Sequence, residues 1–238
     1  MIPIGDATPL RRVPLINWLL IAANVLVFFY ELSLPARALD RFIFAWGVIP
    51  QNVLAALGDP FAPNALHAFE TLITSQFIHG GWLHLLGNML FLWIFGDNIE
   101  DILGSLGYLF FYLLCGVLAG LTQVYVTSPF LGTQASPAIG ASGAIAGVLG
   151  AYLILYPTAR VSVLLPVLVL LLPIDLPAFV MIGWWFVQQF FYGIASLTPA
   201  AARSGGIAFW AHLGGFVSGL VLILPFVGRA RRRTYWRG

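Results

Sequence analysis

Long apolar segments follow one another along this chain, and few of them contain a charged side chain. Charged residues make up only 8% of the 238 positions, against about a quarter in soluble globular domains. A helix of about 20 apolar residues can cross a bilayer, because it satisfies its own backbone hydrogen bonds within the lipid. The sequence therefore predicts an integral membrane protein that is in contact with a lipid bilayer.

We expect an all-α bundle with six transmembrane helices, in a single domain over residues 1–238. The predicted spans are residues 13–30, 81–99, 103–126, 137–156, 176–194 and 206–227. A long first loop separates the first two spans, and its apolar stretches predict short helices that lie partly in the membrane interface. Residues 161–172 are expected to form an interfacial or half-buried segment. If they crossed the membrane as a seventh span, the arginine-rich C-terminal tail would end on the outer side.

The positions of the arginines predict the orientation. With six spans, both termini and the turn at Arg160 lie on one side, which then holds eight of the eleven arginines. Cytoplasmic loops are enriched in basic residues, so the N-terminal residues 1–12 and the arginine-rich tail 228–238 are expected in the cytoplasm. A simple six-span core of this kind is typical of a bacterial inner membrane protein.

The rest of the composition excludes several kinds of site. The sequence has no lysine, which excludes a Ser–Lys dyad, a Schiff-base lysine and a lysine-bearing phosphate loop. Cys115 is the single cysteine, so an internal disulfide and a multi-cysteine metal site are excluded as well. We expect no metal and no other cofactor. We also expect no nucleic-acid partner, because the membrane topology already accounts for the positions of the arginines.

Ser142 lies between two glycines near the start of the fourth apolar segment. Gly140 and Gly143 remove side-chain bulk, so a reacting chain could approach the hydroxyl closely. Pro137 restricts the residue before it to extended conformations, which predicts that the helix begins near the serine. The free N–H groups of a first helical turn favour negative charge, as acyl transfer requires. Taken alone, however, such a pattern of small residues is more typical of a helix-packing face.

Three polar residues are expected at a similar depth below the outer surface. His84, Ser142 and His212 follow the outer ends of three spans, and at 1.5 Å per residue they lie about 5–9 Å inside. Asn88 follows His84 by four residues and shares its helix face. Ionisable groups within spans are costly and usually functional, which favours one shared polar cavity. A Ser–His dyad fits these residues, with His84 and Asn88 available to an oxyanion and no aspartate to orient the base.

Three short motifs occur in order along these spans. Residues 77–90 contain H-x-x-x-N at His84 and Asn88, residues 140–143 match G-x-S-G, and residues 211–219 match A-H-x-x-G-x-x-x-G. Together they resemble the motifs of the rhomboid intramembrane serine proteases, and the resemblance covers nearly the whole membrane core.

The resemblance implies a rhomboid-like bundle that hydrolyses a peptide bond in or next to the transmembrane helix of single-span membrane proteins. Ser142 would be the nucleophile and His212 the general base. His84, Asn88 and the Ser142 N–H would stabilise the oxyanion, and Gly140 would belong to the loop along which the substrate backbone approaches.

The resemblance also implies structural roles near this site. Ala211, Gly215 and Gly219, at four-residue spacing, are expected to pack the sixth span against the fourth, which brings His212 to Ser142. Gly143 is also expected to have a structural role near the site. His79 is expected to make structural hydrogen bonds near the mouth of the cavity. Many family members carry an aromatic residue four positions after the serine, where this chain has Ala146, so Trp210 and Phe209 become candidates to hold the base.

Two other functions stay open. A catalytically silent relative would bind or escort membrane proteins, although such relatives usually lose the serine or the histidine. A small-solute transporter would show an internal repeat with paired broken helices, and the sequence shows one broken segment, at residues 173–177.

Overall fold

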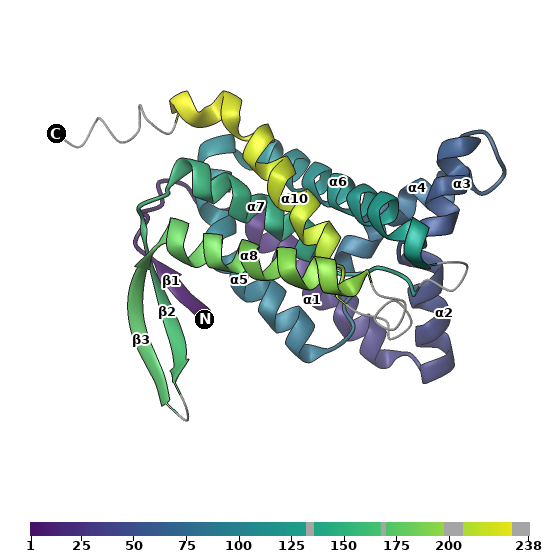
Figure 1. The fold of residues 1–238 in the computed structure, drawn as a ribbon, viewed down its shortest axis with the longest axis horizontal. Helices are drawn as coiled ribbons and strands as arrows, with labels where there is room; N and C mark the ends of the chain where they lie inside the picture. Colours follow the sequence, from purple (N-terminus) through teal and green to yellow (C-terminus); the bar gives the residue numbers. More distant parts are fainter. Residues whose placement is uncertain (132–135, 168–169, 198–206, 230–238) are drawn as a thin grey trace.

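The computed structural model describes residues 1–131, 136–167, 170–197 and 207–229. Within these residues, six apolar helices form a bundle (Figure 1). They are α1 (Leu15–Ser33), α5 (Trp82–Leu103), α6 (Ser105–Leu131), α7 (Ser142–Leu155), α8 (Ala178–Ser196) and α10 (Phe209–Leu222). Each corresponds to one of the six predicted segments, and the fourth helix begins at the serine, as predicted.

The lengths of these helices decide how many can cross a membrane. Four are long and apolar enough on their own, namely α1, α6, α8 and the segment Phe209–Arg229 that contains α10. A fifth span results if α5 is counted together with Ala65–Phe77, from which it is bent by 83°. With 14 residues, α7 is only about 21 Å long. The chain is a mostly helical polytopic membrane protein, and the six crossings stay a prediction. Gly206 and the tail from residue 230 lie outside the described residues.

The predicted short helices of the first loop are present. They are α2 (Ala36–Trp46), α3 (Pro50–Gly58) and α4 (Ala65–Thr74), followed by a 3-10 turn over Ser75–Phe77. The loop is tied to the segment before the serine, because Val48 and Ala138 exchange two backbone hydrogen bonds of 3.0 and 2.9 Å. This bridge fixes the chain at Ala138, four residues before Ser142.

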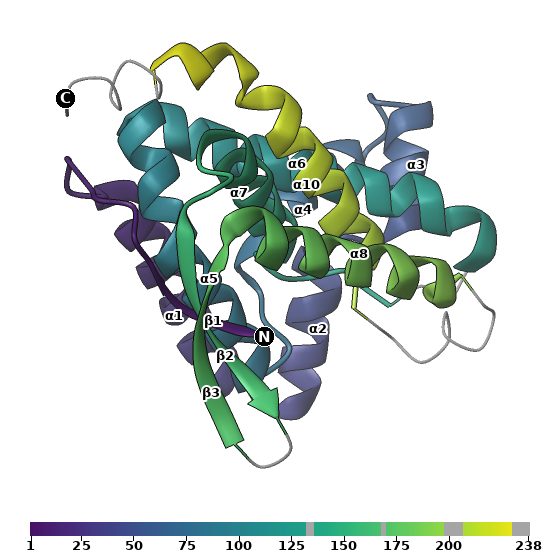
Figure 2. The ribbon, with the colours of Figure 1, turned by 60° about the vertical axis from the view of Figure 1, so that its left-hand side comes forward.

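The prediction of an all-α chain is wrong at the N-terminus and at residues 161–172. Strands β1 (Ile2–Asp6), β2 (Arg160–Val167) and β3 (Leu170–Pro177) form an antiparallel sheet in the order β1-β2-β3. Prolines disfavour a helix in this stretch, and the β-branched Val161 and Val163 are buried on one face of β2. In Figures 1 and 2 the β2–β3 hairpin projects away from the helix bundle.

Small residues allow α7 and α10 to pack with their backbones in contact. A Cβ atom at Gly215 would overlap the carbonyl oxygen of Gly143, and one at Gly219 would overlap that of Gly147. This is the packing expected from the spacing of the small residues. Because both contacts advance by four residues in the same direction, the two helices are parallel. Their N-terminal ends, with Ser142 and His212, therefore lie together at one end of the bundle.

Candidate active site

Ser142 and His212 face each other across the contact between α7 and α10. Ser142 is the first residue of α7, and its Oγ lies 2.8 Å from Nε2 of His212, in the first turn of α10. The two residues are 70 positions apart in sequence. His212 is only 8% exposed, so its ring is largely shielded from solvent and lipid. The structure thus brings together the hydroxyl and the imidazole predicted to form a dyad.

His84 and Gly140 lie directly beside the serine. The Gly80 N–H donates a 3.3 Å hydrogen bond to Nδ1 of His84, so the neutral ring carries its proton on Nε2. Gly140 has a φ of +119°, and a Cβ atom there would be 2.7 Å from His84 Nε2 and 3.7 Å from Ser142 Oγ. The bare glycine therefore keeps the His84 N–H donor open toward the serine hydroxyl.

A second polar chain leads from Asn88 to helix α1. The Asn88 side-chain amide donates to Nε2 of His79 over 3.0 Å, and both residues are buried. The backbone N–H of His79 in turn donates to both carboxylate oxygens of Glu31, at 3.2 and 3.3 Å. The structure therefore places His79 as a hydrogen-bond partner of Asn88. Glu31, which sequence reasoning assigned only to the start of the first loop, holds the His79 backbone.

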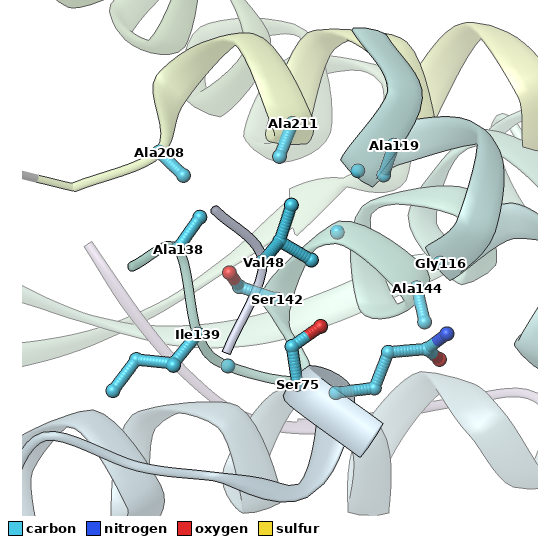
Figure 3. A pocket seen from close by; sticks show the side chains of 14 residues that line it. Val48, Ser75, Gly116, Ala119, Ala138, Ile139, Ser142, Ala144, Ala208 and Ala211 are labelled. Atoms are coloured by element: carbon cyan, nitrogen blue, oxygen red, sulfur yellow. The ribbon is translucent and has the colours of Figure 1, made fainter. Parts of the chain in front are cut away.

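Ser142 borders two cavities. The larger has a volume of about 690 Å³ and is lined by the polar groups His84, Asn88, Ser142 and His212 together with apolar side chains that include Phe91 and Trp185. The smaller, shown in Figure 3, has a volume of about 30 Å³, which is room for a water molecule. In that view Ser75 and Ser142 lie across from Ala208 and Ala211 at the start of α10. Substrate-sized molecules fit only the larger cavity.

Three helix N-termini converge on the larger cavity. His84, Ser142 and His212 all belong to the first turn of their helices, α5, α7 and α10, and all line this cavity. The prediction that they share one polar cavity is confirmed. Because free N–H groups and helix dipoles favour negative charge at an N-terminus, the site suits an anionic intermediate. Within the described residues, no group of three or more His, Cys, Asp or Glu side chains could hold a metal ion.

A family model for the Rhomboid domain matches residues 67–229, which is more than half of the chain. The chain belongs to the rhomboid family. The resemblance seen in the sequence motifs is thereby confirmed, and the matched range includes every candidate site residue from His79 to Gly219.

Rhomboid relatives from yeast and bacteria are similar to this chain at about 30% identity. Rhomboid protein 1, mitochondrial, of Saccharomyces cerevisiae is 30% identical over 152 residues, which cover 63% of this chain and 40% of the relative. Rhomboid protease GluP of Bacillus subtilis is 33% identical over 140 residues, covering 59% of this chain and 24% of the relative. Putative rhomboid protease YdcA of the same organism is 31% identical over 148 residues, covering 61% and 64%. The chain thus spans less than two thirds of the length of each.

In this rhomboid, the rings around His212 differ from those predicted. Trp185 of α8 lies 5.8 Å from the His212 ring at an interplanar angle of 36°, and Phe209 approaches edge-on at 6.2 Å and 87°. Trp210 instead donates its indole N–H to the Gly193 carbonyl over 3.0 Å. Phe209 therefore contacts His212 as predicted. The prediction for Trp210 is wrong, because its ring turns toward α8.

Gln189 is the other contact of His212 that sequence reasoning missed. Its Oε1 lies 2.8 Å from Nδ1 of His212, and the side chain is 8% exposed. The signal was available in the rhomboid sequence, since a polar residue inside an apolar span is costly and usually has a function. What the sequence could not show is which face of α8 packs on α10.

Proposed function

We propose that this rhomboid is an intramembrane serine endopeptidase that cleaves other membrane proteins in or next to a transmembrane helix. The observation that carries the proposal is the 2.8 Å contact between Ser142 Oγ and His212 Nε2, at the edge of a cavity of about 690 Å³. Relatives named as rhomboid proteases support the same activity.

In the proposed reaction His212 acts first as general base and then as general acid. It takes the Ser142 proton as Oγ attacks the substrate carbonyl, and then gives that proton to the leaving amine. The resulting acyl-enzyme is hydrolysed by water, with His212 again as base. The His84 Nε2–H, the Asn88 amide and the Ser142 backbone N–H are the donors proposed for the oxyanion of each tetrahedral intermediate.

The geometry of the site favours an unwound substrate segment. A regular helix engages its carbonyls in its own hydrogen bonds, so a scissile bond must leave the helix before Ser142 can reach it. The bare Gly140, next to the bridged residue Ala138, leaves room for such a backbone to lie beside Ser142. We therefore expect single-span membrane proteins with a weak or broken helix near the cleavage site as substrates.

We infer that the site opens toward the outer face and that both termini are cytoplasmic. Strand β1 pairs with β2 next to the turn at Arg160, so the N-terminus and this turn lie together. Because α7 and α10 are parallel, the C-terminal end of α10 lies at the same end, opposite the site. The arginines that flank these segments favour a cytoplasmic location, in a bacterial inner membrane.

The proposal is tested by cleavage of a model single-span substrate in liposomes. We expect the intact protein to cleave it, and Ser142→Ala and His212→Ala to abolish cleavage while their melting temperatures stay close to that of the intact protein. Cleavage that survives Ser142→Ala would contradict the proposed mechanism. A folded intact protein that binds but does not cleave several helix-destabilised substrates would favour the escort function instead.

A further inference from the structure

We propose that Gln189 is a positioning residue that fixes His212 in the tautomer whose Nε2 is free to accept the serine proton. Trp185, four residues earlier on the same face of α8, holds the plane of the imidazole. Nothing in the sequence motifs points to either residue. The role in catalysis rests on the proposed function, whereas the tautomer itself can be measured without it.

The direction of the hydrogen bonds follows from a backbone group that can only accept. The carbonyl of Trp185 lies 3.4 Å from Nε2 of Gln189, so the amide NH₂ points toward it. Oε1 of Gln189 then faces Nδ1 of His212 at 2.8 Å. Since Oε1 is an acceptor, Nδ1 must carry the proton. The lone pair is therefore on Nε2, which accepts from the Ser142 hydroxyl at 2.8 Å.

The opposite tautomer is incompatible with this chain of bonds. It would aim a lone pair of Nδ1 at the lone pairs of Oε1, and it would aim an N–H of Nε2 at the hydroxyl that must be deprotonated. Both Gln189 and His212 are 8% exposed, so water cannot easily replace the lost partner. The buried amide thus selects the one tautomer that can act as a base.

Aromatic rings fix the remaining freedom of the imidazole, which is rotation about its bond to Cβ. Trp185 covers one side at 5.8 Å and 36°, and Phe209 stands edge-on at 6.2 Å and 87°. Phe216 lies behind Trp185 at 6.3 Å and supports it. The hydrogen bond therefore sets which nitrogen faces the serine, and the rings keep it there.

The tautomer can be read from the ¹⁵N shifts of labelled histidine in the full-length protein. We expect His212, identified by the signals lost in His212→Ala, to be protonated on Nδ1 and bare on Nε2. Gln189→Leu keeps the side-chain size but removes the acceptor, so it should convert a large share of His212 to the Nε2–H tautomer. Gln188→Leu, one position along the same helix, is the matched control and should leave the spectrum unchanged. Native His212 signals in Gln189→Leu would overturn the inference.

Kinetics test the consequence for catalysis. We expect Gln189→Leu to lower kcat about 10–100-fold with little change in KM, within the range of about 10²–10⁴ that general-base catalysis contributes. Gln188→Leu should keep native values. A Gln189→Leu enzyme with native kcat would show that the bond is only structural. An intact protein that cleaves nothing would contradict the proposed function, while the ¹⁵N spectra would still decide the tautomer.

Gln189→Glu provides a rescue that a purely structural role would not give. A carboxylate restores the acceptor, so we expect kcat to recover in part. It also stabilises the imidazolium, so the acid limb of the pH–rate profile should move to higher pH. Among the described residues, the ionisable group that acts on His212 from a neighbouring helix is His84 of α5, and it is unchanged in this variant. An unshifted profile with no recovery would count against the inference.

Discussion

At Gly140 a single hydrogen atom in place of a side chain keeps the site open. The backbone φ of +119° is one that L side chains rarely adopt, and the place of a Cβ atom is 2.7 Å from His84 Nε2. We expect Gly140→Ala to lower kcat/KM by at least about 100-fold, as removal of an oxyanion donor does, because His84 must move away from the serine. Gly58→Ala, where a Cβ atom meets nothing within 4 Å, is the matched control. Cleavage assays on both variants decide the point, and native activity in Gly140→Ala would contradict it.

The sequence pointed to some of the site residues and missed others for a physical reason. His84, Asn88, Ser142 and His212 could be named, because each lies at a fixed spacing within a motif or near one end of an apolar span. Gln189, Trp185 and Glu31 could not be assigned, because their partners are far away in sequence. Their contacts depend on how α8 packs on α10 and on where α1 ends against the loop before α5.

At the scale of helices, the distance between serine and histidine depends on the backbone contact of α7 with α10. We expect Gly219→Ala to destabilise the protein by about 1–3 kcal/mol or more, because the added Cβ overlaps the Gly147 carbonyl and backbones cannot repack like side chains. Cleavage should fall as well, since His212 is carried on the same helix. Gly183→Ala, in α8 with open space around it, should keep or slightly raise the melting temperature. Equal melting temperatures for the two variants would contradict this account.

The elements differ in how well the sequence predicted them. Apolar helices were found with their ends within a few residues, because length and hydropathy are local properties. The sheet was missed because β2 pairs on one side with β1, about 160 residues away, as in the partners Ile2 and Leu164. A window of sequence cannot show such a pairing. The prolines and valines of residues 161–172 were signals against a helix, but they did not identify a partner strand.

At the scale of the whole molecule, the β2–β3 hairpin is an exposed apolar feature outside the helix bundle. Residues 161–174 contain no charged side chain, and Val167, Leu170, Leu171 and Leu172 are 41–61% exposed. Leu170 and Leu171 point to opposite faces of the strand, so both faces are apolar near its end. A hairpin of this kind fits a membrane interface, where lipid covers the side chains while headgroups and water reach the open strand edges.

Spin labels can test where this hairpin lies. A label on Leu171→Cys should be more accessible to oxygen than to a water-soluble nickel complex, because oxygen concentrates in lipid. A label on Asp175→Cys, on the same face of the same strand, is expected to show the reverse. Cys115 is buried and leaves the background nearly silent. Equal access of the nickel complex to both sites would place the hairpin in water.

The hydrogen bond between Gln189 and His212 joins helix α8 to helix α10. Several side chains of α8 are exposed on its outer face, among them Trp184, Phe190 and Phe191. A small molecule that enters the contact between α8 and α10 from the lipid could separate these two helices. The His212 imidazole would then rotate although the molecule had not entered the larger cavity. In the proposed mechanism such a compound would be a non-competitive inhibitor, and its potency would not depend on the substrate.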